Sequence, residues 1–152
     1  MPVEDGTSEG PGHLPVTVPA GRTRGDLFDP ACPTRQLLDR LGGKWTSMSI
    51  AVLGDEYPGE VRFAELKRRM PGISQKMLAQ TLRSLERDSL VERRVEPTTP
   101  PRVHYRLTEL GLSLTEPIAA LRNWAEQHMA QIDDAGLAWD AARRELHPHI
   151  EV

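Results

Sequence analysis

The chain has 152 residues, a net charge of −3 and one cysteine, and no run of apolar residues is long enough to cross a membrane. This length accommodates one domain with its own core, plus tails. No basic segment followed by an apolar run marks the N-terminus, so we expect no secretory signal. A single thiol forms no internal disulfide, which fits a protein of the reducing cytoplasm.

Positive charge is concentrated in the middle of the chain. Residues 62–106 contain eleven Lys and Arg against five Asp and Glu, a net charge of +6 with histidine neutral. Residues 1–31, 32–61 and 107–152 carry −3, −1 and −5. A basic centre between acidic ends is typical of a protein that meets phosphate groups with one surface.

Residues 1–31 are rich in Gly, Pro, Thr and acidic residues and show almost no apolar periodicity. We expect a disordered tail, either with or without a function of its own. The folded domain is expected over residues 32–131. A C-terminal tail or short amphipathic helix is expected over residues 132–152.

Three helices are predicted before the basic segment and at its start. We expect them over residues 33–41, 44–54 and 63–70, the first ended by Gly42–Gly43 and the third by Pro71-Gly72. Apolar residues at three- and four-residue steps share one face in each and are expected to face inward in the second and third. They are Leu37, Leu38 and Leu41, then Trp45, Met48, Val52 and Leu53, then Phe63, Leu66 and Met70.

The fourth predicted helix has a polar face as well as an apolar one. Ser74 is a favourable N-cap, and the helix extends to about Arg87. The predicted buried stripe is Met77, Leu78, Leu82 and Leu85. The opposite face of basic and amide side chains is Gln75, Lys76, Ala79, Gln80, Arg83 and Arg87.

A β-hairpin is predicted after this helix. Residues 90–95 and 102–107 read as strands, and the loop Glu96–Pro101 between them contains three prolines. Proline cannot donate to a strand ladder, so the loop forms a stiff, protruding tip.

A long C-terminal helix is predicted after the hairpin. Thr108 is placed to cap it, and Pro117 is expected to end or kink its first stretch. Beyond that point, residues at alternating steps of four and three form a heptad-like seam that needs a partner, either the chain's own core or a second chain. The seam is Leu114, Ile118, Leu121, Ala125, His128 and Ile132, with Trp124 beside it.

The order helix, helix, short helix, tight turn, polar-faced helix and hairpin is typical of a winged helix-turn-helix. The predicted class is therefore mainly α with a small β-hairpin (α+β), carrying a C-terminal dimerisation helix. In this arrangement the polar-faced helix enters the major groove of double-stranded DNA and the preceding helix crosses the backbone. The hairpin reaches a neighbouring minor groove or phosphate.

Five motifs in this order make the chain resemble the HxlR-type family, MarR-related winged-helix transcription regulators of bacteria. They are Cys32-Pro33, Gly42-Gly43-Lys44-Trp45-Thr46, Arg62-Phe63-x-Glu65-Leu66, Gly72-Ile73-Ser74-Gln75-Lys76-Met77-Leu78 and Pro100-Pro101-Arg102-Val103-x-Tyr105-x-Leu107-Thr108-Glu109-Leu110-Gly111. The resemblance covers roughly residues 32–131. Ser47 and Ser49 depart from it, since the family carries bulky aliphatics there.

The resemblance implies a homodimer built through terminal helices, with two recognition helices on a palindrome-like operator. We expect a cytoplasmic, nucleoid-associated regulator that represses more readily than it activates, because blocking a promoter needs no polymerase-contacting surface. The expected dimer contacts are the seam residues and Trp124. The alternative is a winged-helix protein-interaction module that does not read DNA.

Residues expected to contact DNA lie on the fourth helix and around the hairpin. On the helix they are Ser74, Gln75, Lys76, Ala79, Gln80 and Arg83, because Gln and Arg suit base edges and Lys suits phosphate or guanine. Elsewhere they are Lys44, Arg62, Thr98, Thr99 and Arg102. The simpler alternatives are a solvated helix face, a rigid exposed loop and, at Lys44, a turn that anchors a buried Trp.

Cys32 is a candidate sensor of electrophiles or oxidants, because some HxlR-type regulators carry a reactive cysteine at this point. The thiolate is the reactive form of cysteine, and a helix N-terminus favours it. The alternative is a small buried apolar residue. Between two chains, only a Cys32–Cys32 cross-link or an adduct with a small thiol or quinone is possible.

The sequence carries no recognisable catalytic or metal-binding pattern. There is no Ser-His-Asp order, phosphate loop or paired-carboxylate arrangement, and the histidines lack ligand spacing. These histidines are His104, His128, His147 and His149. We expect no metal and no cofactor, and we rank an enzyme with Cys32 as nucleophile as the weakest hypothesis.

Overall fold

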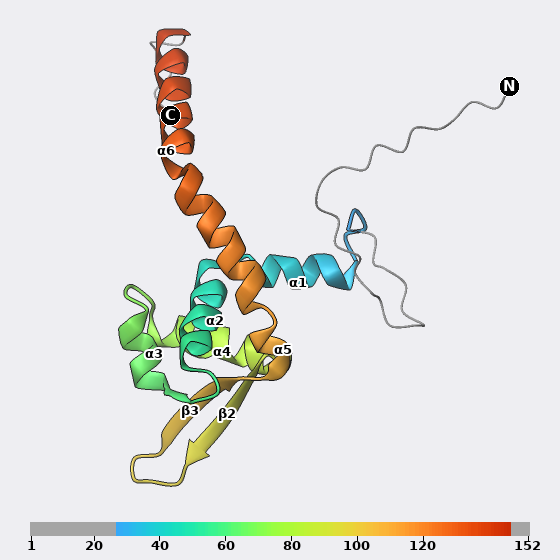
Figure 1. Ribbon diagram of the computed structural model, residues 1–152, viewed down its shortest axis with the longest axis vertical. Coiled ribbons are helices and arrows are strands. Elements are labelled where there is room, and N and C mark those ends of the chain that lie inside the picture. The colour runs from blue at the N-terminus through green and yellow to red at the C-terminus, as the bar shows by residue number, and fades with distance from the viewer. Residues whose placement is uncertain (1–26, 147–152) are drawn as a thin grey trace, which may run out of the picture. The chain divides into compact units, whose positions relative to one another are not determined.

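The computed structural model describes residues 27–146, and Figure 1 shows the arrangement of its elements. In chain order these are α1 (Pro33–Leu41), α2 (Lys44–Glu56), β1 (Val61–Arg62), α3 (Phe63–Arg69), α4 (Gln75–Arg87), β2 (Val91–Glu96), β3 (Arg102–Leu107), α5 (Glu109–Leu112) and α6 (Thr115–Leu146). The chain divides into two units, Met1–Leu38 and Asp39–Val152. Residues 1–26 of the predicted tail lie outside the described residues. The mainly helical chain with a small antiparallel sheet confirms the predicted α+β class.

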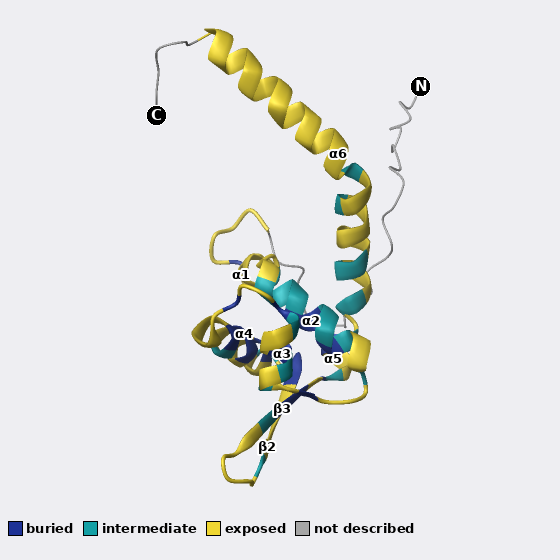
Figure 2. Cartoon of the chain, turned by 90° about the vertical axis from the view of Figure 1, so that its left-hand side faces the viewer, coloured by how far each residue is buried: buried dark blue, intermediate teal, exposed yellow. Residues whose placement is uncertain are grey.

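The core of the second unit lies where α2, α3 and α4 meet the sheet. The α4 residues Leu78, Leu82 and Leu85 are at most 2% exposed and belong to one cluster with Ile50 and Leu53 of α2. Figure 2 shows the buried positions gathered along α2, α4 and the strands. Each fully buried leucine contributes about 1.5–3 kcal/mol to stability. In α1, by contrast, no residue is buried and Leu38 is 52% exposed.

The two serines that interrupt the aliphatic run of α2 have hydrogen-bond partners. Ser47 Oγ donates to the carbonyl of Leu41 at 3.1 Å, and Ser49 Oγ donates to the carbonyl of Trp45 at 2.8 Å. Ser49 is fully buried, and its hydroxyl also lies 3.6 Å from Sδ of Met70. Because both hydroxyls are satisfied, they fit in a packed helix without a large desolvation cost.

The sheet has three strands rather than the two expected from the sequence. Its order is β1-β3-β2, and all pairs are antiparallel, with Val61 opposite Tyr105 and Val91 opposite Leu107. β1 has only two residues, too few to show the alternation by which a strand is recognised. The β2–β3 hairpin extends beyond the helices, and its loop residues 97–101 are all exposed (Figure 1).

The expectation that Met77 belongs to the buried stripe of α4 is wrong, since its side chain is 41% exposed. Thr81 takes the buried position instead, and its Oγ1 donates to the carbonyl of Met77 at 2.8 Å. The three leucines fix the centre of the buried face, and Thr81 lies closer to that centre than Met77 does.

The expectation that Pro117 ends or kinks a helix is also wrong. The interruption falls earlier, between α5 and α6, and Pro117 is the third residue of α6. Backbone N–H groups in the first turn of a helix have no intrahelical acceptor, so proline costs nothing there. Thr108 does cap α5 as expected, because its Oγ1 accepts from the N–H of Gly111 at 3.0 Å.

α6 continues to Leu146, so residues 132–146 belong to this helix and form no separate element. Every residue from 129 to 146 is exposed, and the helix extends away from the core (Figure 2). Within residues 27–146, no helix is both long enough and apolar enough to span a lipid bilayer.

Candidate nucleic-acid interface

The short connection between α3 and α4 positions α4 against the core. Gly72 has φ of +90°, a left-handed conformation that glycine adopts without steric cost. Ser74 then caps α4, since its Oγ accepts from the N–H of Met77 at 3.0 Å. The Ser74 hydroxyl is therefore already engaged as the cap of α4, although the residue is exposed. This turn followed by a capped helix is the helix-turn-helix part of the fold.

The polar residues predicted on α4 are all on its surface. Lys76, Gln80 and Arg83 follow at steps of four and three, so they form one exposed stripe opposite the buried leucines. Gln75 and Ala79 lie on the flank of this stripe, and Ala79 is half-buried. The structure thus brings together the predicted helix residues, with Gln75 and Ala79 beside the main stripe.

The predicted hairpin residues surround the exposed tip. Thr98 and Thr99 lie in the loop, where Thr98 Oγ1 donates to the carbonyl of Pro100 at 2.9 Å. Arg102 begins β3, and Arg62 lies on β1, on the far side of β3 from β2. Both arginines are exposed.

Lys44 stands at the start of α2 with its Nζ 4.4 Å from the centre of the Trp45 ring. The preceding Gly43 offers no side chain to cap the helix, so the first amide groups of α2 lack a side-chain acceptor. The geometry therefore combines the two interpretations of this segment, an exposed cation with open amides and a half-buried Trp anchor.

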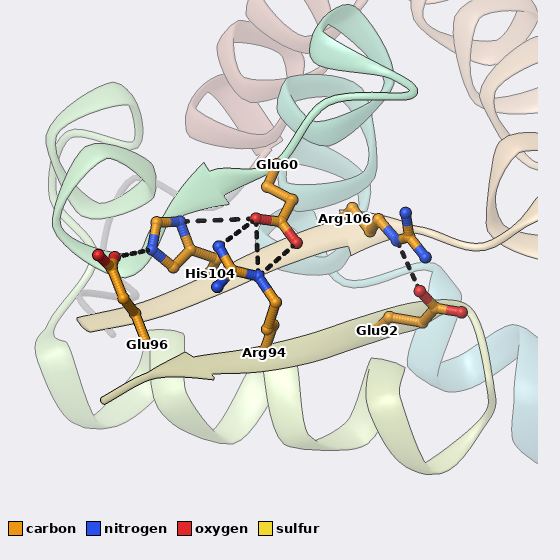
Figure 3. A network of polar contacts seen from close by, with 6 residues as sticks. All are labelled: Glu60, Glu92, Arg94, Glu96, His104 and Arg106. Carbon is orange, nitrogen blue, oxygen red and sulfur yellow. Dashed lines mark hydrogen bonds and ion pairs between the residues drawn. The ribbon is translucent and has the colours of Figure 1, made fainter. Parts of the chain in front are cut away.

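One face of the hairpin carries a network of ion pairs, drawn in Figure 3. Arg94 Nη2 lies 2.7 Å from Glu60, His104 Nε2 donates to Glu96 at 2.8 Å, and Arg106 Nε donates to Glu92 at 2.6 Å. The hydrogen bond from Arg94 lowers the pKa of Glu60. The hydrogen bond from His104, together with the positive charges of the more distant Arg102 and Arg62, lowers the pKa of Glu96. Desolvation opposes the lowering of the pKa at both Glu60 and Glu96.

Six cations of α4 and the sheet make no salt bridge in the described residues, although Arg62 and Arg102 act on the carboxylate of Glu96 from a greater distance. Within residues 27–146, no salt bridge or hydrogen bond engages the side chains of Lys76, Arg83, Arg87, Arg62, Arg93 and Arg102. Carboxylates pair with other arginines, on the hairpin with Arg94 and Arg106 and elsewhere with Arg40, Arg68, Arg69 and Arg122. Cations without an internal partner are available to an external polyanion, whereas paired ones must first break their contacts.

Two residues beside α4 were not among the sequence-predicted contacts. Arg93 of β2 and Tyr105 of β3 are opposite each other in the strand register, and with Ala79, Arg83 and Glu86 they line an open hollow of about 350 Å³. The strand alternation places Arg93 on the same face as the buried Val91. That alternation is the one sequence signal that could have separated Arg93 from Arg94.

Cys32 occupies the N-cap position of α1, because its carbonyl accepts from the N–H of Gln36 at 3.1 Å. Its thiol is not in a disulfide, and the residue is 4% exposed. The predicted location at a helix start is therefore confirmed, and so is the burial that the alternative interpretation requires.

The predicted seam residues fall into two groups along α6. Leu114 and Ile118 pack against the core of the chain itself. Leu121, Trp124 and Ile132 are 69%, 53% and 47% exposed, and Ala125 and His128 are half-buried. The ring of His128 stacks on Trp124, with centroids 4.5 Å apart.

No group of three or more His, Cys, Asp or Glu side chains in the described residues could hold a metal ion. His104 and His128 instead bond to Glu96 and to the carbonyl of Trp124. His147 and His149 lie outside the described residues.

Comparison with known proteins gives these features a family. Residues 40–133 match the family model described as HxlR-like helix-turn-helix. The HTH-type transcriptional regulator YtfH of Escherichia coli (strain K12) is 38% identical over 108 residues, which cover 71% of this chain and 83% of YtfH. An HTH-type transcriptional regulator of Methanothermobacter thermautotrophicus is 37% identical over 127 residues, covering 81% of this chain and 95% of that protein.

Solved structures agree with this relationship. The transcriptional regulator ytfH from Salmonella typhimurium has a TM-score of 0.66 at 38% identity and covers 80% of this chain and 99% of its own. The reduced form of YodB from B. subtilis has a TM-score of 0.53 at 42% identity, covering 63% and 92%. Further related structures show YodB treated with diamide or bound to quinone, and the redox regulator HypR in oxidised and reduced forms.

These relatives are transcriptional regulators and not enzymes, so the hypothesis of an enzyme with Cys32 as nucleophile is wrong. The capped α4, the projecting hairpin and the cations without salt bridges on α4 and the sheet are the parts that such a regulator needs. The chain belongs to the HxlR-like helix-turn-helix family of DNA-binding transcriptional regulators.

Proposed function

We propose that two copies of this chain bind a palindrome-like operator in double-stranded DNA and repress transcription from the promoter it overlaps. The observation that carries the proposal is the placement of cations. Lys76, Arg83 and Arg87 on α4 and Arg93 on the hairpin face next to α4 make no salt bridge in the described part of the chain, whereas Arg94 and Arg106 on the other face are paired with Glu60 and Glu92. The regulator is proposed to act in the cytoplasm, at the nucleoid.

Each α4 is proposed to enter a major groove with its exposed stripe toward the base edges. Gln80 and Arg83 suit adenine and guanine, and Lys76 suits guanine or a phosphate. Gln75, Ala79 and the capping residue Ser74 approach the groove from the flank. Two such helices in a dimer occupy successive grooves about 34 Å, or roughly 10 base pairs, apart.

The hairpin and the start of α2 are proposed to hold the DNA backbone. Thr98, Thr99 and Arg102 reach a phosphate or the minor groove, and contacts of this kind fix the register without reading sequence. Arg62 on β1 supports them. Lys44 and the uncapped amides of α2 provide a further phosphate contact.

The dimer is proposed to form through α6. Leu121, Ala125, His128 and Ile132 continue the seam beyond the part that packs on the core, and Trp124 lies beside it. The same four–three spacing goes on over the extra turns of the helix, at Ala135, Trp139, Ala142 and Leu146, all exposed. A helix that keeps an apolar seam over this length is typical of a coiled-coil partner.

The test is selection of bound sequences from a random pool of DNA duplexes, followed by titration of the selected duplex at several salt concentrations. We expect an inverted repeat with half-sites roughly 10 base pairs apart and an affinity that falls steeply as salt rises. A protein-interaction module would select no sequence and would show no steep salt dependence.

Single substitutions then assign the reading residues. Arg83→Ala is expected to weaken binding of the selected duplex by about 1–3 kcal/mol, and Gln80→Ala is expected to relax base preference at one position of each half-site. Arg106→Ala on β3 is the control, because Arg106 is paired with Glu92 on the hairpin face turned away from α4. Unchanged affinity of Arg83→Ala at fixed salt would remove Arg83 from the interface.

A second proposal is that an electrophile, an oxidant or another small molecule regulates DNA binding, with Cys32 as the reacting group. It is supported by the position of Cys32 at the start of α1 and by similarity to YodB and the redox regulator HypR. Because Cys32 is 4% exposed, the thiol must be uncovered by a local opening before it reacts.

A further inference from the structure

An open hollow of about 350 Å³ separates α4 from the β2–β3 hairpin. Ala79, Arg83 and Glu86 line it from α4, Arg93 from β2 and Tyr105 from β3. It thus lies between the helix proposed to occupy the major groove and the hairpin proposed to reach the next minor groove. A DNA strand that borders both grooves has to pass this point.

The two arginines that line the hollow have no anionic partner of their own. Within the described residues, neither Arg83 nor Arg93 makes a salt bridge or a hydrogen bond. On the opposite face of the same hairpin, Arg94 is paired with Glu60 at 2.7 Å and Arg106 with Glu92 at 2.6 Å. An external anion therefore meets guanidinium groups without salt bridges beside α4, whereas Arg94 and Arg106 on the other face would first have to leave their carboxylates.

The floor of the hollow is held in place by the sheet. Tyr105 is 7% exposed, and its ring lies 6.5 Å from that of Phe63. Because Tyr105 is also opposite Arg93 in the strand register, the backbone under Arg93 is fixed relative to the core. At Ala79 the small side chain leaves room for a ligand between helix and hairpin.

We propose that this hollow seats one phosphodiester of the DNA backbone in each half-site, held between the guanidinium groups of Arg83 and Arg93. Guanidinium groups bind phosphate oxygens through paired N–H donors, and two of them from different elements fix its position. The proposal rests on the proposed function and deepens it. In this refinement Arg83 contacts the DNA backbone in place of the guanine contact proposed above, and Gln80 and Lys76 contact the bases.

Glu86 is the one carboxylate that lines the hollow. Its charge opposes a phosphate, so the ligand is seated toward the two guanidinium groups and away from Glu86. Removal of that charge with Glu86→Gln is expected to strengthen binding a few-fold, by the same amount on every sequence.

The test compares Arg93→Ala, Arg83→Ala and wild type by fluorescence anisotropy on the selected duplex and on an unrelated duplex, over a range of salt. Each variant is expected to weaken binding of both duplexes roughly tenfold and to reduce the slope of log K against log salt by about one. Arg106→Ala, on the paired face of the hairpin, is expected to keep the wild-type slope. Circular dichroism checks that every variant is folded.

A scan of single methylphosphonate substitutions, which neutralise one phosphate at a time, locates the contact. We expect one position per half-site that weakens the wild type and has no further effect on either Arg93→Ala or Arg83→Ala. Wild-type affinity and slope for Arg93→Ala, or a sequence-specific loss for Arg83→Ala, would overturn the proposal while DNA binding stood. A wild type without salt-dependent binding would instead overturn the proposed function.

Discussion

Arg94 and Glu60 form a bidentate ion pair that joins β2 to the segment just before β1. Nε of Arg94 lies 2.9 Å from Oε1 of Glu60, and Nη2 lies 2.7 Å from Oε2. His104 is between this pair and Glu96, with Nδ1 3.8 Å from Glu60 Oε2 and Nε2 2.8 Å from Glu96 (Figure 3). The network joins Glu60 to the middle of the hairpin and to the end of β2 next to the loop, on the face turned away from α4.

This network predicts a loss of stability in acid. The pKa values of Glu60 and Glu96 are lowered in the folded chain, chiefly by hydrogen bonds from Arg94 and His104. A carboxylate with a lowered folded pKa stabilises the fold above its unfolded pKa of about 4.3, and loses this contribution as pH falls through the folded value. The melting temperature, measured at a series of pH values from neutral downward, should therefore decrease once the pH is below about 4.5.

The double variant Glu60→Gln/Glu96→Gln should melt lower at neutral pH and lose less on acidification than wild type. Asp134→Asn is the control, because Asp134 is exposed on α6 and has no salt bridge in residues 27–146. A double variant with the same acid profile as wild type would mean that the network does not link pH to stability.

Gly111→Ala is expected to destabilise the fold by about 3 kcal/mol. A Cβ atom at Gly111 would lie 2.0 Å from the backbone oxygen of Leu90, so α5 would have to move away from the start of the hairpin. Gly136→Ala on α6 is the matched control, because a Cβ there meets nothing within 4 Å. It should stabilise the helix by roughly 0.5–1 kcal/mol. Equal unfolding midpoints in urea would contradict the close approach.

Ser74→Ala is expected to lower stability by about 1 kcal/mol, because the N–H of Met77 loses its acceptor at the start of α4. Ser84→Ala is the control, since Ser84 is exposed within the same helix. Chemical denaturation of both variants measures the difference. An equal stability of the two variants would show that water replaces the cap without cost.

Leu121→Asp is expected to raise the dimer dissociation constant roughly a hundredfold or more, because each copy loses a buried leucine from the proposed seam. Leu137→Asp offers a close control, since Leu121 and Leu137 are 69% and 66% exposed but only Leu121 lies on the seam. Sedimentation equilibrium distinguishes them. Equal effects of the two substitutions would place the dimer contact elsewhere.

Cys32 is expected to react with diamide or a quinone more slowly than an exposed thiol, since it is 4% exposed. Mass spectrometry should find a Cys32–Cys32 cross-link or an adduct of the reagent, and the modified protein should lose operator affinity. Cys32→Ser should bind the operator with wild-type affinity, and treatment with diamide or a quinone should leave that affinity unchanged. Absence of any adduct, with unchanged DNA affinity, would end the sensing proposal.

The parts of the interface that depend on neighbours in the chain were predictable. Ser74 caps α4 because its hydroxyl reaches an amide three residues on, and the polar stripe of Lys76, Gln80 and Arg83 follows from the helical repeat. The hairpin strands were predicted to within one residue, because prolines and alternation mark their ends. Met77 was wrongly assigned to the buried stripe, because packing decides which residue at the edge of a helix face is buried. Pro117 was wrongly expected to end or kink a helix, because its effect depends on where α6 begins.

Arg93 and Arg94 illustrate what can be predicted from the sequence and what depends on tertiary structure. By itself the sequence establishes that these neighbours on a strand point to opposite faces. Only the fold decides that Arg94 meets Glu60, 34 positions away. Arg93 instead lines a hollow together with Arg83 and makes no salt bridge within residues 27–146. The reason is physical: alternation is a local property of the backbone, whereas charge pairing depends on which distant segments the core brings alongside each face.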